Sequence, residues 1–276
     1  MILDRFEYLC PSNVDEAVSA ITTDDELAII SGGTWVVPQM GHHVRRPKIV
    51  VDLRAAGLSG VADKQDTISI GSTTTYSHLI AAGNTPELLR TMALGVTGGV
   101  QIRNKGTIGG SACYANPASD VPGAIVTMNA TMVLRSASGQ REVPATEFFV
   151  DAFTTALRPG EMLEAILVPV NSTGPVFSYQ KFKTAAGSFP IVTAGCVASE
   201  DGLTKRVVIG GAAATPIVVE LDGDESENDV ADRVRSLISE PWSDVQANAN
   251  FRRHTAGTMA QRVVRAVRTT IEGGER

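Results

Sequence analysis

The chain has 276 residues, of which 43% are hydrophobic and 20% charged, and its formal net charge is −6. This composition is typical of a globular protein and excludes a collagen, a coiled coil and a disordered chain. The acidic excess argues against a dedicated nucleic-acid binder, which needs a basic surface. Three widely separated cysteines, Cys10, Cys113 and Cys196, lack the spacing of a zinc or iron–sulfur site. Free thiols and the absence of an apolar leader or a long apolar segment predict a cytoplasmic protein.

The first 56 residues contain short apolar runs separated by polar turns. Strands are predicted at 6–9, 27–30 and 49–53. A helix is predicted after Ser12, because the spacing to Asp15 resembles a capping box. The second strand ends at a Ser-Gly-Gly-Thr sequence, which is typical of a tight loop. This β-α-β-β order with parallel character predicts a first unit, residues 1–56.

Residues 57–172 form the second predicted unit, which ends in a polar joint at 171–175. Its most distinctive part is the glycine-dense segment 98–111. Each glycine costs a helix about 1 kcal/mol relative to alanine, so an ordinary helix is not expected there. The other elements predicted in this unit are strands at 67–70, 131–135, 141–143 and 162–170 and helices at 75–82, 86–96 and 121–128.

Residues 173–276 form the third predicted unit. Apolar runs at hairpin-like spacing predict strands at 176–182, 191–198 and 203–210. Two amphipathic patterns at 229–240 and 258–271 predict helices that follow them. The unit is therefore expected to be a three-stranded antiparallel sheet with helices.

Two glycine pairs carry the functional signal. Gly32-Gly33 lies between Ser31 and Thr34, and Gly109-Gly110 lies between Thr107-Ile108 and Ser111. A glycine-rich turn lets several backbone N–H groups converge on an anion such as a pyrophosphate. We expect the two loops to clamp opposite sides of one dinucleotide. A single Gly-Gly pair is more often a plain turn, and neither pair fits the Rossmann or P-loop motif.

Four motifs stand out in the chain. They are Ser31-Gly32-Gly33-Thr34, Gln101-Ile102-Arg103-Asn104-x-Gly106-Thr107-Ile108-Gly109-Gly110-Ser111, Asn116-Pro117-x-x-Asp120-x-Pro122 and Thr154-x-x-x-x-x-Gly160-Glu161-x-Leu163. Together they resemble the FAD-binding medium subunit of molybdenum hydroxylases, a group that includes carbon monoxide dehydrogenase, xanthine dehydrogenase and bacterial N-heterocycle hydroxylases. The resemblance covers nearly the whole chain. It implies an α+β fold, with a vanillyl-alcohol-oxidase-type (PCMH-type) FAD-binding domain of two α/β subdomains, 1–56 and 57–172, followed by a C-terminal flavoprotein domain, 173–276.

The resemblance also implies which residues bind FAD. The two loops would hold its pyrophosphate through backbone N–H groups and hydroxyls, and Asp120 would contact an FAD hydroxyl or, alternatively, cap the helix at 121–128. A lysine, Lys181 or Lys183, would stabilise the reduced flavin. Trp35 replaces a small or polar family residue, and packing between subdomains is favoured over adenine contact. The complete predicted set is Ser31, Gly32, Gly33, Thr34, Trp35, Thr107, Ile108, Gly109, Gly110, Ser111, Asp120, Leu163 and Lys183, with no catalytic or metal-binding side chain.

The implied function is that of an FAD-carrying electron-transfer subunit in a heteromeric molybdenum hydroxylase. A large molybdopterin subunit would oxidise the substrate, a small subunit with two two-iron clusters would relay electrons, and the FAD of this chain would pass them to an acceptor. The expected assembly is a dimer of heterotrimers, with its metals on the partner chains. A stand-alone FAD-dependent oxidase or reductase and a non-enzymatic module with a degenerate pocket are the alternatives. The substrate and the electron acceptor stay open.

Overall fold

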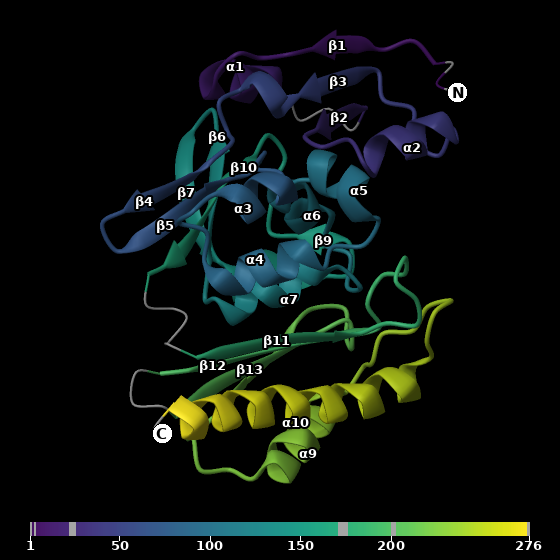
Figure 1. Ribbon diagram of the computed structural model, residues 1–276. Coiled ribbons are helices and arrows are strands. Elements are labelled where there is room, and N and C mark those ends of the chain that lie inside the picture. The colour runs from purple at the N-terminus through teal and green to yellow at the C-terminus, as the bar shows by residue number, and fades with distance from the viewer. Residues whose placement is uncertain (1, 3, 22–25, 171–175, 200–202, 275–276) are drawn as a thin grey trace.

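The computed structural model describes residue 2 and residues 4–21, 26–170, 176–199 and 203–274. Three sheets follow one another from the top to the bottom of Figure 1, with a group of helices between the second and the third. The fold is mixed α/β, as predicted. The predicted joint at 171–175 lies outside the described residues. No helix in the described ranges is long and apolar enough to cross a membrane.

The N-terminal sheet is parallel, with the strand order β1-β3-β2. Helix α1 follows β1, and its N-cap is Asn13, whose side chain accepts from the Glu16 N–H. The predicted cap, Ser12, instead donates to the Glu16 carboxylate. The short helix after the first glycine pair was not predicted. The elements are β1 (Glu7–Leu9), α1 (Val14–Ala20), β2 (Leu27–Ile30), α2 (Val36–Gly41), β3 (Ile49–Asp52) and η1 (Leu53–Ala55).

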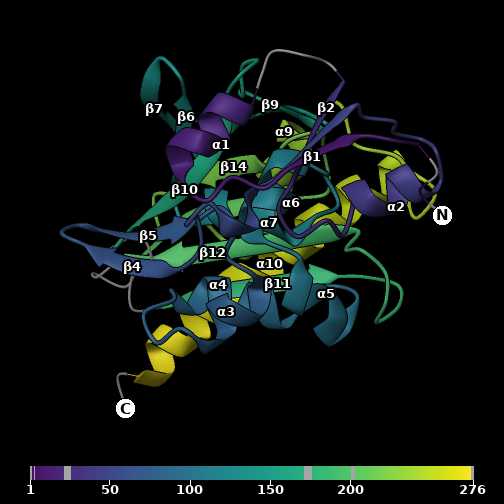
Figure 2. The same ribbon diagram turned by 90° about the horizontal axis from the view of Figure 1, so that it is seen from above.

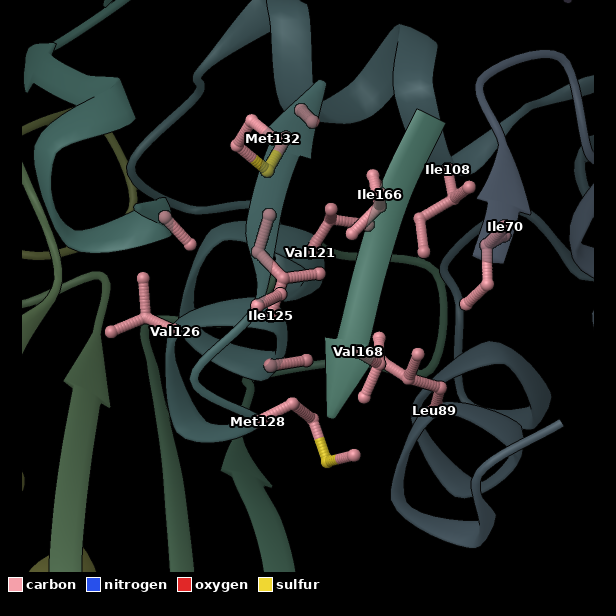
Figure 3. Packing of buried hydrophobic residues seen from close by; sticks show 14 of the residues in the cluster. Ile70, Leu89, Ile108, Val121, Ile125, Val126, Met128, Met132, Ile166 and Val168 are labelled. Carbon is pink, nitrogen blue, oxygen red and sulfur yellow. The ribbon is translucent and has the colours of Figure 1, made fainter. Parts of the chain in front are cut away.

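The second sheet is antiparallel, with the order β4-β5-β10-β6-β7. Helices pack on it through a buried apolar cluster, in which Leu89 lies beside Val168 in Figure 3. The strands are β4 (Val61–Lys64), β5 (Thr67–Gly71), β6 (Thr131–Ser136), β7 (Gly139–Pro144) and β10 (Met162–Pro169), with a hairpin of β8 (Phe149–Asp151) and β9 (Thr154–Thr155). The helices are α3 (Tyr76–Ala81), α4 (Glu87–Leu94), α7 (Asp120–Thr127) and α8 (Ala145–Phe148).

The glycine-dense segment is helical, which contradicts the sequence-based expectation. It forms α5 (Gly99–Lys105) and α6 (Ile108–Tyr114). Gly98 and Gly99 adopt positive φ angles of 92° and 69° where α5 begins. A Cβ on Gly109 would lie 2.4 Å from the Ser72 carbonyl oxygen. The contact between α6 and the end of β5 therefore requires a glycine, and this packing outweighs the helix propensity.

The C-terminal sheet has four antiparallel strands, one more than the sequence predicted. The additional strand is a short apolar run beginning at Ile217. The long last helix covers one face of the sheet and α7 contacts the other, so this sheet bounds the helical group from below (Figure 1). The elements are β11 (Phe177–Phe182), β12 (Val192–Ala198), β13 (Thr204–Gly210), β14 (Ile217–Glu220), α9 (Glu227–Leu237) and α10 (Ala249–Gly274).

A fully buried arginine fixes the start of α10. The guanidinium of Arg252 donates to the carbonyls of Ile191 and Gly211, and its NH2 lies 2.7 Å from an Asp244 carboxylate oxygen. Burial alone would raise the pKa of Asp244, but bonds from Arg252 and from two backbone N–H groups outweigh it and lower this pKa. The cluster joins α10 to the beginning of β12.

Candidate functional site

A cleft of about 740 Å³ lies among the parallel sheet, helices α5 and α6, and the C-terminal loops. This volume is within the ~300–1,000 Å³ typical of cofactor sites. Segments that are distant in the sequence meet here, because the first glycine loop lies against the start of the second on the cleft wall. The predicted residues on its wall are Ser31, Gly32, Gly33, Thr34, Trp35, Thr107, Gly109, Gly110, Ser111, Asp120 and Leu163.

The first glycine loop presents unused donors to the cleft. Within the described chain, the N–H groups of residues 32–35 donate to no protein atom. Gly33 has a φ of +70°, a conformation that favours glycine. A Cβ on Gly32 would lie 2.0 Å from the carbonyl oxygen of Lys105, so a glycine is needed where the two loops touch. Four successive N–H groups without a protein acceptor are available to an anion bound against this loop.

The second glycine loop is arranged differently. Its N–H groups at residues 108–111 donate to the carbonyls of Thr74 and Ser72 and to the hydroxyl and carbonyl of Thr107, at 3.0–3.1 Å. These four donors are already used, which does not fit the predicted backbone donation to a phosphate. The Ile108 side chain lies in the core and does not line the cleft. Hydroxyls are what this loop offers, and the Thr107 hydroxyl lies 2.9 Å from that of Ser31.

At one end of the cleft lies a buried carboxylate with a paired cation. Asp120 is 5% exposed, and its Oδ1 accepts from the Lys181 ammonium at 2.8 Å and from the Tyr179 hydroxyl at 3.0 Å. Burial raises the pKa of Asp120, while Lys181 and Tyr179 oppose this shift. The helix cap is Ser119, so the predicted alternative role of Asp120 as a cap is wrong.

The structure distinguishes between the two candidate lysines. Lys183 does not line the cleft, and its ammonium donates to the carbonyl of Ala186 at 2.8 Å. Lys181 instead bridges Asp120 and the carbonyl of Gly95. Neither lysine lines the cleft, but Lys181 contacts the lining residue Asp120, whereas the predicted Lys183 bonds to Ala186.

Aromatic rings form another part of the wall. Trp35 is 42% exposed, and its ring centroid lies 4.3 Å from that of Tyr114, so it does not fill a buried interface as predicted. Phe153 packs on Tyr114 at 5.2 Å, and Trp242 lies 6.1 Å from Phe153. Burial raises the pKa of Tyr114 to about 12, so this hydroxyl stays neutral at physiological pH. The row of rings extends the cleft wall towards the C-terminal region.

The three cysteines lie in three different environments. Cys113 lines the cleft and Cys196 is buried in the C-terminal core, whereas Cys10 is exposed. Burial raises the pKa of both Cys113 and Cys196 to about 12. Within the described ranges, no group of three or more His, Cys, Asp or Glu residues is arranged to hold a metal ion.

Residues 4–171 match the family described as the FAD binding domain in molybdopterin dehydrogenase. The chain belongs to this family. The carbon monoxide dehydrogenase medium chain of Afipia carboxidovorans is 31% identical over 281 residues, which cover 96% of this chain and 97% of that protein. The xanthine dehydrogenase FAD-binding subunit of Escherichia coli O157:H7 is 27% identical, with 95% and 96% covered.

Solved structures agree with this assignment. In the carbon monoxide dehydrogenase from Hydrogenophaga pseudoflava that lacks the Mo-pyranopterin moiety of its cofactor, one chain superposes with a TM-score of 0.89 at 28% identity. The match covers 97% of this chain and 98% of that chain. The predicted family, FAD as the cofactor and an oxidoreductase subunit as the class of protein are confirmed. The relatives favour this function over a stand-alone oxidase.

The cleft also contains residues that the sequence reasoning missed. Ser72 is buried, and its hydroxyl has no partner among the described residues. The Tyr76 hydroxyl lies 2.5 Å from that of Ser111. The run of hydroxyl residues at 72–75, directly after a strand, was a usable signal. Gly98 lies in the glycine-dense segment but was not among the predicted site residues. No local sequence pattern indicated Thr97 or Phe189.

Proposed function

We propose that this chain is the FAD-carrying electron-transfer subunit of a heteromeric molybdenum hydroxylase. It would accept electrons from the two-iron clusters of a small partner and pass them to an external acceptor, while a large molybdopterin partner oxidises the substrate. The relatives are medium chains of multi-subunit enzymes, which supports such partners. A dimer of heterotrimers, a cytoplasmic location and the three-unit division at 1–56, 57–172 and 173–276 belong to this proposal.

The observation that carries the proposal is the row of four unused N–H groups at residues 32–35, facing the hydroxyls of the second loop. A pyrophosphate is a dense anion that needs several donors at once. The lining contains Arg45 but otherwise little positive charge. Backbone N–H groups and the hydroxyls of Ser31, Thr107 and Ser111 must therefore supply this binding. The free hydroxyl of Ser72 is a further donor. The residues present fit FAD.

The remaining lining residues would orient the flavin. When bound, FAD supplies a centre that takes up electrons singly and releases them in pairs. Lys181 holds Asp120 at one end of the cleft and brings positive charge to that end. Leu163 and the aromatic row exclude water from the walls between the ends. These side chains position and shield the cofactor, and none is proposed to react.

The test is FAD reconstitution of a variant that fills the cleft. A Cβ on Gly110 would lie 2.8 Å from the Thr107 hydroxyl oxygen and 4.0 Å from the Ser31 Cβ. Gly110→Val should therefore obstruct the phosphate site between the loops. We expect at least a ~10-fold weaker FAD affinity, equivalent to about 1.4 kcal/mol. Gly41→Val is the matched control, because nothing lies within 4 Å of that Cβ. Gly109→Val is unsuitable, since it would collide with the Ser72 backbone and test folding instead.

The outcomes are distinct. Wild-type protein should bind FAD with one equivalent per chain, and the control should match it. Unfolding midpoints measured without FAD should be similar for Gly110→Val and Gly41→Val. A wild-type chain that cannot be loaded with FAD contradicts the proposal. Equal FAD affinities of the wild type and a folded Gly110→Val would show that this loop does not form the phosphate site.

A further inference from the structure

Acidic residues are absent from two long segments of this acidic chain. The sequence has 30 Asp and Glu residues, yet none lies at 88–119 and none at 165–199. The same segments contain Arg90, Arg103, Lys105, Lys181 and Lys183. Each of the two segments therefore has a positive net charge, opposite in sign to that of the whole chain.

The two segments meet in space beside the cleft. The Thr97 hydroxyl donates to the Ser188 carbonyl at 2.8 Å, and the Lys181 ammonium donates to the Gly95 carbonyl. Both segments contribute lining at the end of the cleft where Asp120 lies. Figure 2 shows α5 beside α3 on the outside of the molecule. These contacts place the two acid-free segments side by side.

This face, which we term the basic face, consists of Leu94, Val100, Arg103, Lys105, Lys183 and Phe189. Arg103 and Lys183 donate only to backbone carbonyls, and in the described part of the chain no carboxylate lies within ion-pair distance of the three cations. Leu94, Val100 and Phe189 are exposed apolar side chains between them. Helix α5 has no fully buried residue: Ile102 lines the cleft, whereas Val100 and Lys105 are exposed.

We propose that the basic face docks the small iron–sulfur subunit through an acidic surface of that subunit. This inference rests on the proposed function. Exposed apolar residues ringed by charge are typical of a binding surface, and unpaired cations speed and orient the approach of an acidic partner. The face borders the cleft, so a docked cluster lies near the flavin. Each of the two reduced clusters gives one electron to the flavin and is thereby oxidised. Two protons from water complete the reduction of the flavin.

A second copy of this chain fits the face less well. Identical basic faces would repel one another in a two-fold contact, because such a contact brings the same patch together from both subunits. An acidic partner instead neutralises Arg103, Lys105 and Lys183 without burying an unpaired charge. The proposed acidic surface of the iron–sulfur subunit therefore complements this face, whereas a second copy of the chain does not.

The experiment measures electron delivery by the partner separately from reduction by a small molecule. FAD-loaded full-length chain is mixed with the separately produced iron–sulfur subunit of the same enzyme in its reduced form, and the loss of flavin absorbance is followed by stopped flow. The variants are Lys105→Glu, whose side chain makes no hydrogen bond in the described structure, and Arg103→Glu with Lys105→Glu. The control, Lys64→Glu with Arg262→Glu, reverses two exposed cations on β4 and α10.

We expect the bimolecular rate at low salt to fall about 10-fold or more in the double variant and less in Lys105→Glu. The rates should converge with the wild type at high salt, where exposed charges are screened. Reduction by dithionite and FAD content should be unchanged in all variants. Equal falls in the double variant and the control would overturn the docking face, as would self-association of the wild type that Lys105→Glu abolishes. A wild type that the partner cannot reduce contradicts the proposed function itself.

Discussion

The ammonium of Lys181 lies 2.8 Å from the carboxylate of Asp120 and joins β11 of the C-terminal sheet to the first turn of α7. Lys181→Met would leave this carboxylate buried without its cation. Removing one partner of a buried ion pair costs about 3–5 kcal/mol, so the free energy of unfolding should fall by that amount. Urea unfolding of the FAD-free protein measures it. Lys183→Met is the matched control, with a change of less than about 0.5 kcal/mol.

The same pair predicts a pH effect of definite sign. Burial raises the pKa of Asp120, so this carboxylate is more easily protonated in the folded than in the unfolded chain. Losing the Lys181 cation raises this pKa further, and the stability lost by Lys181→Met should therefore be larger at pH 7 than at pH 5. Adding Asp120→Asn should recover part of the loss. A loss that is independent of pH and unaffected by Asp120→Asn would indicate a packing effect instead.

Contact between the two glycine loops predicts the effect of Gly32→Ala. Its Cβ would lie 2.0 Å from the Lys105 carbonyl oxygen, and because this is a backbone atom the loops must separate. We expect at least ~10-fold weaker FAD binding, measured by titration of the FAD-free protein. Gly41→Ala has no atom within 4 Å of its Cβ and should bind FAD like the wild type. Unchanged binding by Gly32→Ala would show that the first loop tolerates displacement.

The carboxylate of Glu161 accepts two bonds from Arg141 at 2.7 Å on the cleft wall. Arg141 lowers the pKa of Glu161 below its ordinary value of 4.5. Because this folded-state pKa is depressed, the pair stabilises fully above the unfolded pKa and is lost as pH falls through the folded value. Glu161→Gln should cost about 1–3 kcal/mol at pH 7 and flatten the acid limb of stability. Urea unfolding across pH checks this. An acid limb as steep as that of the wild type contradicts it, and Glu87→Gln, at an exposed pair, is the control.

Arg252 predicts the largest effect in the C-terminal region. Arg252→Met removes the donor to three backbone carbonyls, those of Ile191, Gly211 and Ala247, and leaves Asp244 without its cation. We expect the free energy of unfolding to fall by about 3–5 kcal/mol. Denaturant unfolding measures the loss. Arg253→Met, at the next position and bonded only to the carbonyls of Ile238 and Ser239, should cost much less. Similar losses in both would show that the burial of Arg252 is not decisive.

Apolar periodicity identified most of the strands, because a buried run such as residues 27–30 is visible without its neighbours. The glycine-dense segment was misjudged because the reason for its glycines lies elsewhere in the chain. Gly109 is required by the Ser72 carbonyl, and Gly32 by the carbonyl of Lys105. Local propensity does not include such contacts. Helix α2 and strand β14 are each too short to produce a clear periodic signal.

The candidate site divides in a similar way. The glycine loops and Asp120 were found because their motifs are local, and the structure brings them to one cleft. The choice between Lys181 and Lys183 depends on how β11 lies against α7, which spacing alone does not reveal. The row of rings depends on a hairpin that places Phe153 beside Tyr114. The Phe153 N–H donates to the Ala115 carbonyl, and both residues have positive φ angles. This tertiary contact has no signal in the sequence.

The burial of two thiols has a practical consequence. Cys113 and Cys196, with pKa values raised to about 12, hold almost no thiolate at neutral pH, whereas Cys10 is exposed at the end of β1. A maleimide dye or spin label should therefore attach at a single position on the native chain. Such a label lies on the parallel sheet, away from the basic face, and would report partner binding by distance without engineered cysteines.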